Sequence, residues 1–133
     1  MQRLKTRAQF QAVLAGAIIA RTAHFALHCT SLNGPDSADK PGAPSALFRQ
    51  YDMWLGAMVP KRWAKRAVTR NAIKRQIYVV SSEYADSYPR SAFVVRLRCA
   101  FAKTEFLSAV SDSLRQAVRT EVQALMKAGA KAA

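Results

Sequence analysis

Residues 59–78 read VPKRWAKRAVTRNAIKRQIY and contain seven Lys or Arg residues but no Asp or Glu. Acidic residues are absent from Met53 to Ser82, so neighbours in the sequence do not neutralise this charge. If the chain becomes helical near Arg66, a turn of about 100° per residue places Ile73, Ile77 and Val80 on one side. The stretch therefore predicts an amphipathic helix that packs its apolar side on a core and leaves a charged side free.

The charged side of this helix has the chemistry of a phosphate-binding surface. Five side chains share an arc of roughly 140°, namely Arg70, Asn71, Lys74, Arg75 and Tyr78. Four more basic residues precede the helix in its loop, namely Lys61, Arg62, Lys65 and Arg66. The unpaired N–H groups and partial positive charge of a helix N-terminus also favour anions. Loop and helix are thus predicted to bind the same kind of ligand.

The composition of the whole chain favours nucleic acid as that ligand. The chain has 21 Lys plus Arg against 8 Asp plus Glu, a formal net charge of +13 and a pI near 10.6. Basic residues can simply keep a small protein soluble. A net charge of this size, however, destabilises a compact state by self-repulsion, which binding to a polyanion relieves.

The 133 residues suffice for one core, so we expect a single domain spanning residues 1–133. Residues 33–49 are expected to form a mobile loop and residues 128–133 a frayed tail. The expected elements are a helix at 6–15, strands at 23–31 and 51–60, the basic helix, a strand at 92–100 and a final helix capped by Thr104. The apolar stripe of that helix comprises Leu107, Val110, Leu114, Val118, Val122 and Leu125. The order αββαβα predicts an α+β domain with helices packed on a small sheet.

A secretory signal is the alternative interpretation of the N-terminal residues, because basic side chains precede the apolar run 13–20. Phe10, Val13 and Leu14 recur at helical spacing, which favours an amphipathic helix. Cys29 and Cys99 lack metal-ligand spacing and are expected to be buried thiols. The apolar runs are too short to span a bilayer, so we expect a cytoplasmic protein without a membrane partner.

The basic stretch resembles the protein subunit of bacterial ribonuclease P. That family has a V-x-K-K/R segment leaving a strand, a short basic loop, and a helix opening A-x-x-R-N-R-x-K-R. Here the segments are VPKR at 59–62 and AVTRNAIKR at 67–75, and the resemblance extends to RLK at 3–5, FQAVL at 10–14 and HFALH at 24–28. It implies a subunit that binds the catalytic RNA and precursor tRNA and assists removal of the 5′ leader.

The same resemblance implies that hydrolysis belongs to the RNA subunit, with magnesium bound there. It implies no cofactor, no metal site and no catalytic residue in the protein itself. The sequence agrees, since it has no metal-ligand cluster or nucleophile elbow, and His24 and His28 would simply share one face of a strand.

The resemblance also implies a cleft for the single-stranded leader between the first helix and the sheet. Its residues here are Phe10 and Leu14 on the helix and Ala26 and His28 on the strand. Rings such as those of Phe10 and His28 hold single strands by stacking. Alternatively, Phe10 and Leu14 belong to an ordinary core, as their i, i+4 spacing allows.

Two positions depart from the family pattern. Ala72 replaces the second arginine of the motif, and Tyr78 stands where another basic residue is common. Each departure removes one possible phosphate contact, which Trp63, Lys65 and Arg66 can offset nearby. Two other protein classes remain open: a ribosomal or general RNA-binding protein with no role in cleavage, and a secreted cationic protein with a Cys29–Cys99 disulfide.

Overall fold

The computed structural model describes residues 1–32, 47–101 and 112–132. Their elements in chain order are β1 (Gln2–Arg3), α1 (Arg7–Leu14), β2 (Ala17–Arg21), β3 (Phe25–Thr30), β4 (Trp54–Met58), α2 (Ala67–Tyr84), a 3₁₀ turn η2 (Ala85–Ser87), β5 (Ala92–Leu97) and α3 (Asp112–Ala132). The strands form one sheet in the order β1-β4-β5-β3-β2. β4 pairs in parallel with β1 and β5, while β3 runs antiparallel to β5 and β2. The predicted α+β class is confirmed.

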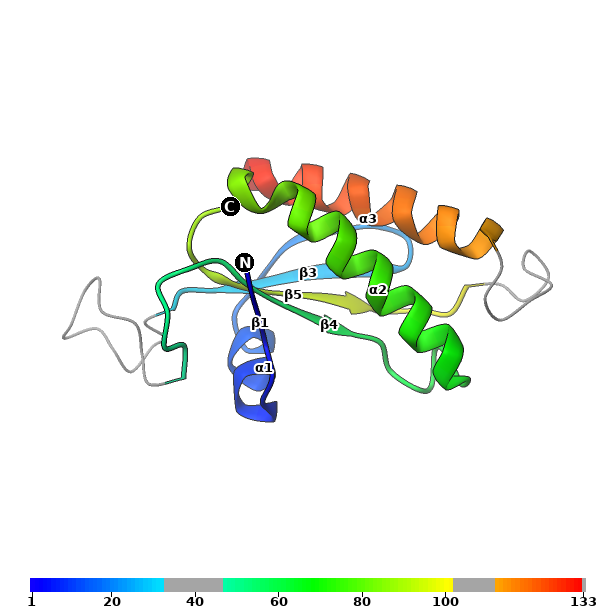
Figure 1. Cartoon of the computed structure of the whole chain (residues 1–133), viewed down its shortest axis with the longest axis horizontal. Helices are drawn as coiled ribbons and strands as arrows, with labels where there is room; N and C mark the ends of the chain where they lie inside the picture. The colour runs from blue at the N-terminus through cyan, green and yellow to red at the C-terminus, as the bar shows by residue number, and fades with distance from the viewer. Residues whose placement is uncertain (33–46, 102–111, 133) are drawn as a thin grey trace.

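Helices α2 and α3 cover one face of the sheet, and α1 lies on the other (Figure 1). The larger core cluster joins strand residues such as Leu27, Leu55 and Phe93 to both helices. Ile73, Ile77 and Val80 of α2 are buried there, which confirms the predicted apolar stripe. On α3, Leu114, Val118, Val122 and Leu125 are buried as well. The basic side of α2 is thereby turned away from the core.

A second, smaller cluster forms under α1. The helix begins with a capping box in which the Thr6 hydroxyl accepts from Gln9 N (3.2 Å) and Gln9 Oε1 accepts from Thr6 N (3.1 Å). The buried Gln9 amide also donates to the Leu47 carbonyl (2.9 Å). Val13 is fully buried beside Phe48. Thus α1 is fixed both to the sheet and to the segment before β4.

The sheet contains two strands that we did not predict. β1 has two residues, and β2 occupies part of the apolar run that follows α1. The helix ends at Leu14, and a Cβ on Gly16 would collide with the Cys29 carbonyl oxygen, so the chain passes close to β3 only because this residue is glycine. β2 then pairs antiparallel with β3, with a register shift between Ile18 and Ala20.

Three other expectations fall on regions where the structure differs or is not described. The expected frayed tail is helical in α3 as far as Ala132, because Gly129 is buried against Leu27 and Tyr88. The end of the expected loop is anchored, since Phe48 is only 1% exposed. The remainder of that loop, residues 33–46, lies outside the described residues. So do Thr104, Leu107 and Val110.

Candidate RNA interface

The loop between β4 and α2 folds as a tight turn that presents basic side chains to solvent. Pro60 O accepts hydrogen bonds from Trp63 N (3.1 Å) and Ala64 N (3.2 Å). Around this turn, Lys61, Arg62, Lys65 and Arg66 are all exposed. The α2 N-cap residue, Arg66, makes no capping hydrogen bond through its side chain. Basic side chains and the helix N-terminus thus face solvent together, as predicted.

On α2 the predicted polar residues follow one side of the helix, but Arg70 differs from the others. Asn71 and Arg75 are exposed and Lys74 is half-buried. Arg70 Nη1 donates to the carbonyl oxygens of Ala64 (3.0 Å) and Lys65 (2.8 Å). The Arg70 guanidinium therefore fixes the basic loop onto α2 and also adds positive charge to this surface. Our expectation that Arg70 lies free on the solvent face was incomplete.

A hollow of about 360 Å³ lies where β1 meets the middle of α2. It is lined by Arg3, Asn71, Lys74, Arg75, Tyr78 and Val79. The Arg3 guanidinium lies 4.0 Å from the centroid of the Tyr78 ring. Sequence reasoning missed Arg3 as part of this surface, since only the sheet brings it beside α2.

The residues predicted for the leader cleft share the α1 face of the sheet. Ala26 and His28 alternate along β3 with Phe25 and Leu27, which face α2 and α3. Phe10 lies over Gly56, where an added Cβ would be 2.5 Å from Phe10 Cε1. Glycine at this position of β4 therefore lets the ring lie on the sheet.

The burial of these four residues agrees in part with each of the two interpretations, a leader cleft and an ordinary core. Phe10 and Leu14 are only partly buried, packed against the smaller cluster under α1. Ala26 and His28 are 1% and 5% exposed. Phe10 and Leu14 thus keep accessible surface at the edge of this cluster, whereas Ala26 and His28 are buried in the sheet.

His28 sits in a positively charged environment on this face. Arg96 Nε donates to His28 Nε2 (3.0 Å), so a neutral His28 carries its proton on Nδ1. Nδ1 is buried and has no hydrogen-bond partner within the described part of the chain. Burial, together with the charges of Arg96 and Arg21, lowers the pKa of His28 below its usual value. The strand alternation that groups Arg96 with Val94 could have identified this arginine from the sequence.

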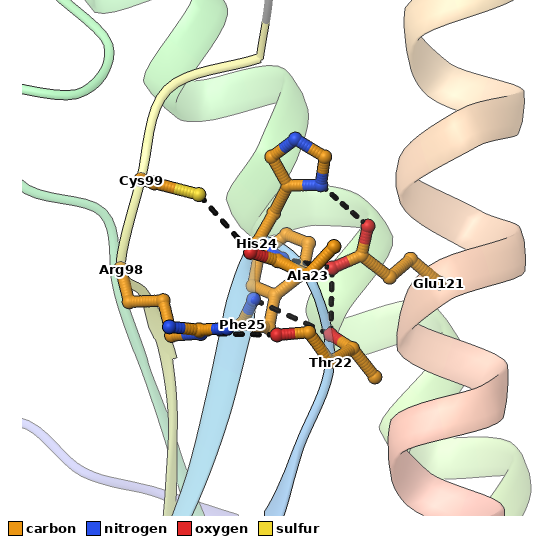
Figure 2. Close-up of polar contacts among 7 residues, drawn as sticks. All are labelled: Thr22, Ala23, His24, Phe25, Arg98, Cys99 and Glu121. Carbon is orange, nitrogen blue, oxygen red and sulfur yellow. Dashed lines mark hydrogen bonds and ion pairs between the residues drawn. The ribbon is translucent and has the colours of Figure 1, made fainter.

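His24 does not share the face of His28, contrary to our expectation. β3 begins only at Phe25, because Thr22 and Phe25 close a tight turn through Thr22 N and Phe25 O (2.9 Å). The His24 side chain instead points to α3, where Nδ1 lies 2.7 Å from Glu121 Oε1 (Figure 2). The same carboxylate accepts from the Thr22 hydroxyl (2.6 Å) and His24 N (2.7 Å). Glu121 therefore attaches the β2–β3 turn to α3.

The two cysteines are free thiols in the structure, so the Cys29–Cys99 disulfide of the secreted alternative is not formed. Cys99 Sγ donates to the Ala23 carbonyl (3.1 Å) beside the His24 turn (Figure 2). Burial raises the pKa of Cys29. None of the described helices has the length and apolar character needed to cross a membrane.

Together these features define a small, strongly basic α+β protein with charge concentrated on one helix and its preceding loop. Comparison with known proteins gives the family. The sequence profile of Ribonuclease P matches residues 1–124. The ribonuclease P protein components of Bordetella parapertussis and Bordetella avium are 31% and 32% identical over 122 residues, covering 92% of this chain and 86% of each relative. The chain therefore belongs to the ribonuclease P protein family.

Solved structures agree with this fold. The RNase P protein of Staphylococcus aureus matches with a TM-score of 0.63 at 18% identity, covering 96% of this chain and 94% of that one. The RNase P protein of Thermotoga maritima matches with a TM-score of 0.61 at 19% identity, covering 96% of both chains.

Proposed function

We propose that this chain is the protein subunit of ribonuclease P. It binds the catalytic RNA through the basic loop and α2, and it binds the 5′ leader of precursor tRNA in the cleft under α1. Hydrolysis of the leader takes place in the RNA subunit, which binds magnesium, while the protein positions the substrate. The names of the Bordetella relatives support the proposal.

The observation that carries the proposal is the separation of two different surfaces by one sheet. On one side, α2 and its loop present basic groups in a segment without acids, which suits the phosphates of a folded RNA. On the other side, Phe10 is partly buried against the cluster under α1, and the buried His28 is paired with Arg96 on the sheet. Stacked bases there would contribute about 1 to 3 kcal/mol each. Mature tRNA has no leader to make these contacts.

The test reconstitutes the full chain with its catalytic RNA, transcribed in vitro. Precursor tRNA should bind the holoenzyme more tightly than mature tRNA, and the protein should accelerate removal of the leader. Replacing Phe10 and His28 with Ala should narrow the difference in affinity between precursor and mature tRNA while assembly with the catalytic RNA persists. Replacing Asn71, Lys74 and Arg75 with Ala should instead weaken assembly. Arg70 is left unchanged because it holds the loop.

The two sets of variants control for each other, and thermal melting shows that each remains folded. Unaltered discrimination in a folded Phe10 and His28 variant would assign these residues to the core and remove the leader-binding claim. A wild-type chain that binds many RNAs equally and does not stimulate cleavage would indicate the alternative, a general RNA-binding protein.

A further inference from the structure

Arg3 reaches α2 by a contact that the motif does not contain. Its backbone lies in β1, paired with Leu55 of β4, and Leu4 N donates to the Leu55 carbonyl (2.9 Å). Its guanidinium lies over the Tyr78 ring at 4.0 Å. Tyr78 occupies the helix position at which the family commonly has a basic residue. The Arg3 guanidinium therefore places a positive charge beside Tyr78, although Arg3 belongs to β1 and not to α2.

The Tyr78 ring is itself held by the sheet. β1 pairs with β4 only as far as Leu55, which leaves the next N–H on that edge, Ala57 N, without a strand partner. The Tyr78 hydroxyl accepts from this N–H at 3.2 Å. The ring thus satisfies a backbone donor at one end and presents its face to Arg3, which restricts the guanidinium to one side.

The charges around this hollow are of one sign. Lys74, Arg75 and Arg3 line it together with the Asn71 amide, which can donate a hydrogen bond. In the described part of the chain, none of the three cations forms an ion pair with a carboxylate. Arg3 is an exposed residue, so its planar N–H groups remain accessible to a ligand. The hollow therefore offers both the positive charge and the hydrogen-bond donors that an anion requires.

We propose that the hollow between β1 and α2 binds a backbone phosphate of the catalytic RNA and that Arg3 contacts it directly. Arg3 thereby replaces the contact that Tyr78 removes from the helix. The proposal rests on the proposed function, and it extends the RNA surface from the motif to the N-terminal strand.

The experiment measures binding of the full chain to its catalytic RNA over a series of salt concentrations. One lost phosphate contact should reduce the slope of log K against log salt by about 0.7 to 0.9, equivalent to roughly 5- to 8-fold weaker binding at 0.1 M salt if the difference vanishes at 1 M. Arg3→Ala should show this loss. Its backbone pairing in β1 does not use the side chain, so we expect the variant to fold.

Arg90→Ala is the matched control, because the Arg90 guanidinium also lies over a tyrosine, 5.1 Å from the Tyr51 ring centroid, but does not line the hollow. It removes the same charge and the same kind of contact, and the salt slope should stay at the wild-type value. Arg3→Gln keeps much of the stem over Tyr78 and should lose the same slope as Arg3→Ala.

Equal slopes for Arg3→Ala and Arg90→Ala would overturn the proposal, as would wild-type binding by Arg3→Gln. Either result would leave the proposed function intact, provided the wild-type chain binds the catalytic RNA. Failure of the wild type to bind that RNA would instead refute the proposed function itself.

Discussion

Replacing Glu121 should destabilise the fold far more than an ordinary surface glutamate. Its carboxylate accepts three hydrogen bonds from the β2–β3 turn, at 2.6 Å from the Thr22 hydroxyl and 2.7 Å from both His24 N and His24 Nδ1. The side chain is only 17% exposed, so water replaces these bonds poorly. At about 1 kcal/mol for each bond, Glu121→Ala should lower the free energy of unfolding by about 2 to 4 kcal/mol.

Urea denaturation followed by circular dichroism measures this loss, and the m-value should stay constant. The melting temperature should fall by roughly 3 to 5 °C for each kcal/mol in a chain of this size. Glu83→Ala is the control, because Glu83 pairs with Arg119 at 3.0 Å but is 47% exposed. A pair of that kind contributes about 0 to 1 kcal/mol. Equal losses for the two variants would refute the argument.

Glu121→Gln separates hydrogen bonding from charge. The amide oxygen can still accept from Thr22 and His24 N, and the amide nitrogen can donate to Nδ1 of a neutral His24. We therefore expect most of the stability to remain. A loss as large as that of Glu121→Ala would assign the stabilisation to the negative charge.

Two further predictions concern the α1 face. Because burial and neighbouring arginines lower the pKa of His28 in the folded state, the unfolded chain takes up the proton first as pH falls below about 6.5, and the free energy of unfolding should decline there. His28→Gln should remove this part of the decline. If the difference in the free energy of unfolding between wild type and His28→Gln stays constant from about pH 7 to pH 5, the decline does not come from His28. Gly56→Ala would place a Cβ 2.5 Å from Phe10 Cε1 and 2.8 Å from Leu4 Cδ1. Displacing these side chains should lower the free energy of unfolding by about 1 to 3 kcal/mol, which thermal melting measures. An unchanged melting temperature would show that Phe10 does not pack on Gly56.

The basic helix could be predicted because its information is local. Ile73, Ile77 and Val80 recur at helical spacing, and all three are buried as that spacing requires. Arg70 shows the limit of the same reasoning. Its spacing places it on the polar side, but its two acceptors are backbone carbonyls of the preceding turn, and helix periodicity carries no information about that turn.

Strand positions were harder to predict because a shift of one residue reverses the faces. The first predicted strand begins at Ala23, which would place His24 on the same face as His28, whereas β3 begins at Phe25 and His24 turns to α3. β2 lacks a clear alternation of polar and apolar residues, and its pairing with β3 decides its conformation. The proximity of Arg3 to Tyr78 likewise depends on β1 joining the sheet, a long-range contact that the sequence pattern does not encode.

The position of β4 explains how one small domain could align a leader with the catalytic RNA. Gly56 receives the Phe10 ring on the α1 face, while the adjacent residue, Ala57, holds the Tyr78 hydroxyl on the α2 side through its N–H. Consecutive residues of one strand thus support both proposed RNA-binding surfaces. β4 ends at Met58, and the chain then passes through Pro60 into the basic loop, so the loop starts close to the end of a paired strand. β4 pairs with both β1 and β5 along its first residues, so the strand that contacts both surfaces is fixed within the sheet. Under the proposed function, this shared strand would set the distance between the bound leader and the catalytic RNA.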